Sequence, residues 1–386
     1  MSFTFNTTKS IRMGAGLAAE LGAIAHEVLG PRVMLVTDAG MMATDIIHRA
    51  QTVLDEAGVA VTLFADVVAD PPEAVVKAAA AQAREAGVTG VLGLGGGSSL
   101  DVAKLAALLA ASDQPLAEAY GVGNAKGPRL PLMLVPTTAG TGSEVTPVSI
   151  VTTGAREKMG VVSPVILPDV ALLDPELTLG LPAHVTAATG IDAMVHAIEA
   201  YASASPNNNP ISRALAREAL RLMGGALLRA VRTPDDLAAR SDMLLGSLLA
   251  GQAFANSPVA AVHALAYPLG GHFKLPHGLS NALVLPHVLR FNAVTAPQAY
   301  AEIAAIAFPE MGGTGQGAQA LAADFADALA GLAMECGLPE RLRDAGVTRE
   351  ALPALARDAM NQQRLLVNNP RPVAEADALA IYEAAF

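Results

Sequence analysis

Four residues in the second half of the chain have the types and spacing of ligands for a divalent metal. Asp192 and His196 are four positions apart in GIDAMVHAIEA, so an α-helix would place both side chains on one face. His263 follows in an apolar helical segment, and His277 stands at the predicted start of the next helix. One carboxylate and three imidazoles favour Fe2+ or Zn2+ over Mg2+, which prefers oxygen ligands. Any one of these side chains alone could be an ordinary hydrogen-bonded residue, so the prediction depends on the set.

A glycine-rich turn lies between a buried strand predicted at 88–94 and a helix predicted at 100–111. The turn consists of Gly95, Gly96, Gly97, Ser98 and Ser99. Glycines let a phosphate oxygen approach the backbone, and the following helix supplies free N–H groups and a favourable dipole. The turn therefore predicts a phosphate-binding loop, although a plain strand–helix turn can have the same composition.

Two further polar positions could serve the same ligand. Thr137, Thr138 and Thr141 lie in a turn after the strand predicted at 132–135 and would face the glycine loop if the strands are neighbours. Asp38 ends an earlier strand, where a carboxylate can accept from the ribose 2′-hydroxyl of NAD and repel the phosphate of NADP; a local Asx turn is the alternative. Because this acid precedes the glycines instead of following them by about 20 residues, the sequence predicts a nucleotide site outside the common Rossmann order.

The elements that must position these groups differ between the two halves of the chain. Strands predicted at 31–37, 59–64, 88–94 and 132–135 alternate with helices, a pattern typical of a parallel sheet covered by helices. From about residue 181 helical periodicity dominates, and no strand is predicted after Leu173. We predict a Rossmann-like α/β nucleotide-binding domain at 1–179 and an all-α metal-binding and substrate domain at 180–386.

Composition excludes several classes of protein. Only 16% of the 386 residues are charged and 52% are hydrophobic, which excludes a disordered chain. The net charge of −11, without a run of Lys or Arg, argues against nucleic-acid binding. The single cysteine, Cys336, excludes an intramolecular disulfide framework, and the first residues lack a secretory signal pattern, so we expect a cytoplasmic protein.

Residues 243–273 form a stretch of 31 residues without Asp, Glu, Lys or Arg. A bilayer span needs only about 20 apolar residues. The stretch nevertheless contains Gln252, Asn256, His263 and two prolines, and small residues outnumber the large apolar ones. We therefore expect a buried core whose polar residues have partners, and no membrane association.

Several motifs together resemble the iron-containing (group III) metal-dependent alcohol dehydrogenases. They are GGGSSLDVAK at 95–104, PTTAGTGSEVTP at 136–147, LPDVALLDPELT at 167–178, GIDAMVHAIEAY at 190–201, HALAYPLGGHFKLPHGLSNALVLPHV at 263–288 and NPRPV at 369–373. The motifs follow the family order across nearly the whole chain. The resemblance implies a dehydroquinate synthase-like architecture, with the active site between an N-terminal nucleotide-binding domain and a C-terminal helical domain.

The resemblance also implies roles for individual residues. Asp192, His196, His263 and His277 would bind the metal, Fe2+ or alternatively Zn2+. NAD would be bound by the glycine loop, the three threonines and Asp38, joined by Lys158, which could instead be a solvated turn lysine. The family further implies a homodimer or larger homo-oligomer.

The chain departs from the family pattern at two places. Where many members carry a second histidine four residues after the first, this chain has Tyr267, which is a poor base at neutral pH because its ordinary pKa is near 10. We place both Tyr267 and His272 at the catalytic site, with Tyr267 as a hydrogen-bonding or packing group and His272 as a substrate contact or a support of the site. The usual Asn-Pro after the second strand is replaced by Asp70-Pro71, and we expect Asp70 to face away from the phosphates.

The function that the resemblance implies is reversible, metal-assisted hydride transfer between a small primary alcohol or diol and NAD. Three alternatives use the same residues differently or not at all. A metal-dependent lyase resembling dehydroquinate synthase would need several basic side chains, yet Lys274 is the only one between His263 and His277. A nucleotide-binding protein without catalysis predicts no turnover, and a serine hydrolase would need a Gly-x-Ser-x-Gly motif, which the chain lacks.

Overall fold

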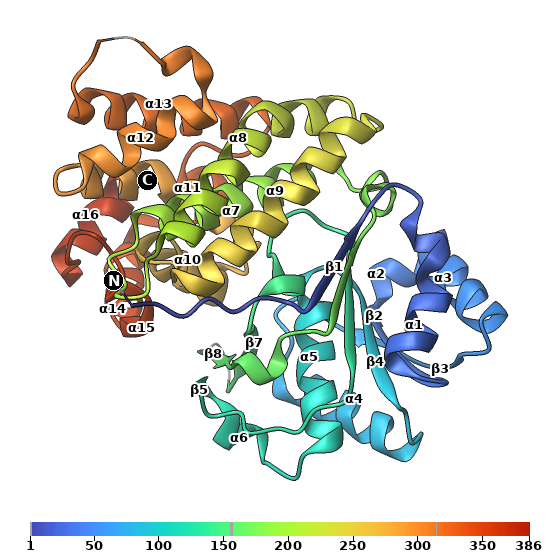
Figure 1. Ribbon diagram of the computed structural model, residues 1–386. Helices are drawn as coiled ribbons and strands as arrows, with labels where there is room; N and C mark the ends of the chain where they lie inside the picture. The colour runs from blue at the N-terminus through green and yellow to red at the C-terminus, as the bar shows by residue number, and fades with distance from the viewer. Residues whose placement is uncertain (1, 155–156, 314) are drawn as a thin grey trace. The chain divides into compact units, whose positions relative to one another are not determined.

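A computed structural model describes residues 2–154, 157–313 and 315–386, which divide into two compact units (Figure 1). The sheet unit comprises Asn6–Thr138 and Gly142–Leu179. The helical unit comprises Gly180–Phe386 together with Met1–Phe5 and Ala139–Thr141. The main boundary thus falls between Leu179 and Gly180, but two short segments of the N-terminal half belong with the helices.

A six-stranded parallel sheet with strand order β1-β9-β6-β4-β2-β3 forms the centre of the sheet unit, which confirms the predicted α/β architecture. Its strands are β1 (Ser10–Met13), β2 (Arg32–Asp38), β3 (Ala60–Val67), β4 (Gly90–Gly95), β6 (Leu132–Pro136) and β9 (Val170–Leu173). Every residue of β4 and β6 is buried, because helices cover both faces of a parallel sheet. Since β2, β4 and β6 are neighbours, their carboxyl ends meet at one edge of the sheet.

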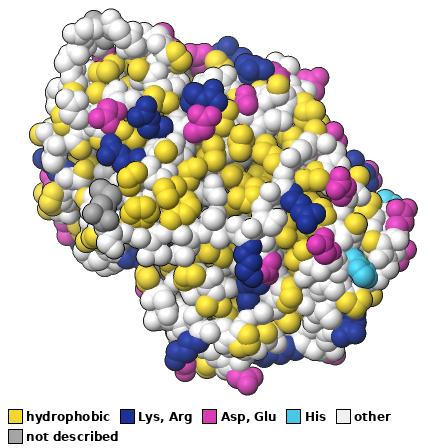
Figure 2. Space-filling view, in the orientation of Figure 1, with side chains coloured by type: hydrophobic (Ala, Val, Ile, Leu, Met, Phe, Trp, Pro, Cys, Tyr) yellow, Lys and Arg dark blue, Asp and Glu magenta, His cyan; other side chains and the backbone are white. Residues whose placement is uncertain are grey.

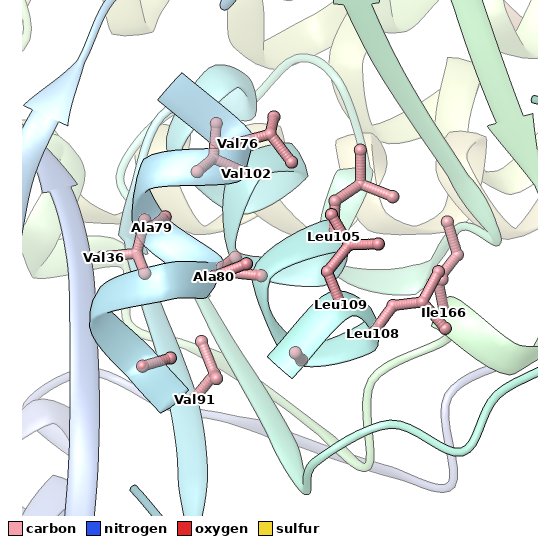
Figure 3. Close-up of a cluster of buried hydrophobic side chains, with 14 of the residues drawn as sticks. Val36, Val76, Ala79, Ala80, Val91, Val102, Leu105, Leu108, Leu109 and Ile166 are labelled. Carbon is pink, nitrogen blue, oxygen red and sulfur yellow. The ribbon is translucent and has the colours of Figure 1, made fainter. Parts of the chain in front are cut away.

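Helices cover both faces of this sheet. Those of the sheet unit are α1 (Leu21–Leu29), α2 (Ala39–Met42), α3 (Asp45–Glu56), α4 (Glu73–Glu85), α5 (Gly97–Ala111) and α6 (Leu116–Ala119). Successive residues of β2 point to opposite faces: Val36 packs with α4 and α5, whereas Leu35 packs with α1 and α3. Figure 3 shows the first of these cores, where Val76 of α4 and Leu105 of α5 lie among buried apolar side chains.

A second, three-stranded sheet was not predicted from the sequence. It consists of β5 (Gly121–Val122), β8 (Glu157–Val162) and β7 (Val148–Thr153), with β7 and β8 antiparallel. These strands are only half-buried at many positions, so they lack the continuous apolar runs that identified the large sheet.

The helical unit contains no strand among its described residues, as the sequence predicted. Its helices are α7 (Ala183–Ala202), α8 (Pro210–Arg232), α9 (Leu237–Asn256), α10 (Ala261–Phe273), α11 (His277–Ala293), α12 (Pro297–Ala307), α13 (Ala318–Glu335), α14 (Leu352–Ala359), α15 (Gln363–Leu366) and α16 (Glu375–Ala385). α8 begins at a sequence signal that is readable without the structure, since Asn209 caps it and Pro210 occupies its first position.

The uncharged stretch 243–273 forms most of α9 and all of α10, which are largely buried. Its polar residues have partners, as expected: Asn256 donates to the Gln252 carbonyl and accepts from Asn207. Among the described residues, no helix is both long enough and apolar enough to pass through a bilayer. Figure 2 shows the exposed Lys and Arg side chains in small separate groups on the face in view.

Candidate metal and cofactor sites

The four predicted metal ligands come together from three helices of the helical unit. Asp192 and His196 lie on α7, His263 in the first turn of α10, and His277 is the first residue of α11. Asp192, His196 and His263 each offer a ligand atom, and these three atoms lie within 4.8 Å of one another. Helical spacing explains the first pair, whereas the packing of α10 and α11 against α7 brings the two other histidines to it.

His277 forms the open side of this cluster. Its Nε2 lies 3.7 Å from Asp192 Oδ1, and its ring centroid lies 5.3 Å from that of His263. The His277 side chain is 38% exposed, compared with 3% for Asp192 and for His263. A ligand arriving from solvent would therefore meet His277 first.

The protonation of the cluster suits metal binding. Burial lowers the pKa of His196 to about 3, so its imidazole is neutral. His196 Nδ1 lies 3.2 Å from the Gly140 carbonyl, which can only accept, so this nitrogen carries the proton and Nε2 keeps its lone pair. Burial alone would raise the pKa of Asp192, but the neighbouring imidazoles and the Asn281 amide outweigh burial and lower it. One carboxylate together with three imidazoles is a donor set that fits Fe2+ or Zn2+.

Asn281 of α11, which the sequence analysis did not identify, lies among the ligand atoms. Its Nδ2 is 2.5 Å from Asp192 Oδ1, 3.2 Å from His277 Nε2 and 3.4 Å from His263 Nε2. Atoms of three predicted ligands thus surround the electron-poor NH2 group of Asn281. A cation requires a similar surrounding of acceptor atoms. Asn281 Oδ1 is buried without a hydrogen-bond partner among the described residues. Buried polar atoms without a partner are rare in native proteins, and a functional role or a bound ion is one explanation for them.

Three further residues around the cluster were missed at the sequence level. Glu199 of α7 accepts a hydrogen bond from His263 Nδ1 at 2.7 Å, and Phe254 of α9 stacks on His196 with ring centroids 4.4 Å apart. Gly140 supplies the carbonyl that fixes His196. Glu199 lies one helical turn after His196 on α7, whereas Phe254 lies on α9, which carries none of the predicted ligands. An acid or an aromatic residue on a helix has no unique sequence signature.

Tyr267 and His272 occupy different environments on α10. Tyr267 is half-buried, and its ring lies 5.8 Å from that of His277. His272 Nε2 lies 2.6 Å from Asp358 Oδ2 on α14. Nine residues of helix separate His272 from His263, a rise of about 13 Å, whereas Tyr267 lies about one helical turn after His263 and beside His277.

The glycine loop and Asp38 meet at the carboxyl edge of the large sheet. Gly95 ends β4 with φ of +151°, a conformation that favours glycine, and Gly97, Ser98 and Ser99 form the first turn of α5. Asp38 ends β2, where its side chain caps α2 through Met41 N and accepts from Ser99 Oγ at 3.0 Å. The acid expected at the ribose is therefore hydrogen-bonded to the loop expected at the phosphates.

The threonine-rich turn follows β6, the strand beside β4. Thr137 N donates to the Gly95 carbonyl at 3.0 Å, and a Cβ on Gly96 would lie 3.8 Å from Thr138 Cγ2, so the two turns are adjacent. Thr141, in contrast, belongs to the helical unit, as part of Ala139–Thr141. The predicted cofactor residues are therefore divided between the two units.

Lys158 lies on β8 in the small sheet. Its Nζ is 2.6 Å from Asp70 Oδ1 and 3.1 Å from Thr152 Oγ1. Asp70 thus forms an ion pair with Lys158, the basic residue predicted at the cofactor site.

A buried polar network, also unassigned by the sequence analysis, ties α5 to the chain after the threonine-rich turn. Asp101 accepts from Ser143 Oγ at 2.6 Å and from Ile150 N at 2.8 Å. Lys104 Nζ donates to the Val148 carbonyl at 2.7 Å, and burial lowers the pKa of this amine to about 8. Burial also raises the pKa of nearby Glu144 to about 7. The network holds the glycine loop's helix and residues 143–150 in one arrangement.

Comparison with known families identifies both halves of the chain. Residues 8–175 match the family model described as iron-containing alcohol dehydrogenase, and residues 186–386 match the C-terminal domain of the same family. The long-chain-alcohol dehydrogenase 1 of Geobacillus thermodenitrificans is 41% identical over 379 residues, covering 97% of this chain and 94% of the relative. The 1,3-propanediol dehydrogenase of Klebsiella pneumoniae is 37% identical and covers 92% of each chain.

Solved structures agree with these matches. A 1,3-propanediol oxidoreductase superposes with a TM-score of 0.95 at 35% identity, covering all of both chains. The sulfoacetaldehyde reductase of Bifidobacterium kashiwanohense in complex with NAD+ superposes with a TM-score of 0.88 at 32% identity, covering 100% of this chain and 99% of the other.

Proposed function

Because this chain belongs to the iron-containing alcohol dehydrogenase family, and is therefore an NAD-dependent alcohol dehydrogenase that uses a divalent metal, we propose that it interconverts small primary alcohols or diols with their aldehydes. The observation that carries the proposal is the convergence of Asp192, His196 and His263 in the helical unit of a chain that matches the family along its length. The diol activity named for two of the similar proteins supports this substrate class.

The metal would be held by Asp192, His196, His263 and His277. Bound there, Fe2+ would supply Lewis-acid polarisation of the alcohol or aldehyde oxygen. The protein contributes ligand geometry: the Gly140 carbonyl and the Glu199 carboxylate leave Nε2 of His196 and His263 available. The exposed His277 marks the side from which substrate would approach.

The cofactor would be bound by the residues predicted from the sequence. Backbone N–H groups at the start of α5 would meet the diphosphate, and Asp38 would accept from the ribose, with Thr137, Thr138, Thr141 and Lys158 completing the site. The adjacency of the two turns and their position at the carboxyl edge of the sheet support this assignment. Backbone donors also explain how an acidic protein binds a diphosphate.

Tyr267 and His272 would have supporting roles and take no part in the hydride transfer itself. The proximity of the Tyr267 ring to His277 supports a packing or hydrogen-bonding role next to the open ligand. The pairing of His272 with Asp358 supports a role in fixing α10 against α14.

The proposal is tested with purified protein by metal analysis and by NADH formation with a panel of short alcohols and diols. The His263→Ala variant should lose metal retention and turnover while NAD binding persists. His184→Ala removes an exposed histidine from the first turn of α7 and is the matched control. Metal-free protein that oxidises alcohols at full rate would refute the four-ligand site.

We also propose that the chain acts in the cytoplasm as a homodimer or larger homo-oligomer. The apolar side chains Ile11 and Met13 are exposed on β1, an edge strand, and the single cysteine is buried, which suits a reducing compartment. Sedimentation velocity and cell fractionation test these two points, and a purely monomeric species at micromolar concentration would contradict the first.

A further inference from the structure

Glu199 is a buried carboxylate that joins α7 to the start of α10. It lies three residues after His196, and its two oxygens accept three hydrogen bonds. Oε2 accepts from Ala260 N at 3.0 Å and from His263 Nδ1 at 2.7 Å, while Oε1 accepts from Val262 N at 2.7 Å. One carboxylate thus contacts both the backbone that begins α10 and the imidazole in its first turn.

The backbone contacts fix the start of α10. The residue before the helix, Ala260, has no side chain that could cap it, so free N–H groups of the first turn need an acceptor from elsewhere. Glu199 supplies that acceptor from a neighbouring helix, and its negative charge is favourable at the positive end of the helix dipole. The position of His263 relative to α7 therefore depends on this carboxylate.

The contact with the imidazole fixes which nitrogen of His263 carries a proton. An ionised carboxylate can only accept, so Nδ1 must donate, and Nε2 is left on the side of Asp192, whose Oδ1 lies 3.8 Å away. Carboxylates that hold metal-binding histidines in this way typically change metal affinity about 10–100-fold when removed. We propose that Glu199 is a positioning residue for the metal ligand His263; this inference rests on the proposed metal site.

Glutamine cannot replace Glu199 in this arrangement, although it has the same shape. If its NH2 group faces Val262, two donors oppose each other at the first turn of α10. If the NH2 group instead faces His263, Nδ1 must accept, and the proton moves to Nε2, where it blocks metal coordination. Either orientation disturbs one of the two functions of the carboxylate.

Direct observation of the imidazole tests the inference without any substitution at position 199. In metal-free wild-type protein labelled with 15N-histidine, NMR should show His263 with a protonated Nδ1, the resonance being identified by its loss in His263→Ala. An unprotonated Nδ1 would overturn the inference.

Metal affinity provides the second test. Competition between the protein and a chromophoric chelator for Zn2+ should show a 10–100-fold weaker affinity in Glu199→Gln than in wild type. Glu302→Gln is the matched control, because Glu302 is a hydrogen-bonded acid of the same unit that contacts Tyr201 and Arg213 and no metal ligand. Should Glu199→Gln not fold, Glu199→Asp, which is one methylene shorter, takes its place with the same expectation.

The outcomes separate the inference from the function on which it rests. Wild-type affinity in Glu199→Gln, or lower thermal stability of the metal-free variant with unchanged affinity, would leave Glu199 as a helix cap only and overturn the inference. Wild-type protein that does not bind Zn2+ or Fe2+ would overturn the proposed metal site as well.

Discussion

Gly278 provides a sharp test of how the metal site is held together. It follows His277 in the first turn of α11 and faces α7, where a Cβ would lie 2.2 Å from the Ala188 carbonyl oxygen and 3.3 Å from Asp192 Cβ. Ordinary contact begins near 3.4 Å, so Gly278→Ala must move α11 away from α7 by about 1 Å. His277 would then move relative to Asp192 by several times the tolerance of a metal–ligand distance, which is about 0.2 Å.

We therefore expect Gly278→Ala to weaken Zn2+ binding at least about 100-fold and to lower the free energy of unfolding by about 1–3 kcal/mol. Chelator competition and urea unfolding of the metal-free protein measure the two effects. Gly225→Ala is the control: at this exposed glycine of α8, no heavy atom lies within 4 Å of the place a Cβ would occupy, and alanine there should stabilise the helix by up to about 1 kcal/mol. Wild-type metal affinity in Gly278→Ala would refute the reasoning.

Three other substitutions test separate parts of the structure. Asp38→Gly should shift the ratio of kcat/KM for NAD over NADP by about tenfold, the equivalent of about 1.4 kcal/mol of repulsion, whereas an unchanged ratio would remove the ribose role. Tyr267→Phe should keep at least about half of the wild-type turnover if the hydroxyl is not a proton donor, and near-total loss would make it catalytic. Burial raises the pKa of Glu144 from 4.5 to about 7, so the folded protein loses stability as pH rises through this range. As the pH rises from 5 to 8, the free energy of unfolding of Glu144→Gln should therefore increase by about 2–3 kcal/mol relative to that of wild type, measured by urea unfolding. A difference between the two proteins that does not change with pH would contradict this.

The sequence was most informative where one element carries the whole signal. The four-residue spacing of Asp192 and His196 and the continuous apolar run of β4 are properties of single segments, and both could be read directly. The order of the strands in the sheet, in contrast, depends on packing between distant segments. The short strand β1 and the hairpin of β7 and β8 were missed because they are only half-buried.

The residues that support the site were harder to predict than the ligands. Glu199 and Asn281 lie within four positions of a ligand, but nothing in their local sequence separates a buried partner from a solvated side chain. The placement of Thr141 with the helical unit, while Thr138 stays with the sheet unit, likewise depends on the tertiary structure. The contact of His272 with Asp358 of α14 likewise joins segments that are distant in sequence, so it could not be predicted from the ligand motif.

Because the ligand cluster draws on three helices, α7, α10 and α11, a metal ion bound there would also restrict the unfolded chain. His196 and His263 are separated by about 70 residues, so an ion bound to both would close a long loop and reduce the conformational entropy of the denatured state, as a disulfide does. With Cys336 as its single cysteine, this chain cannot form such a cross-link covalently within itself. Metal coordination would thus give the helical unit a cross-link between distant residues, which its single cysteine cannot provide.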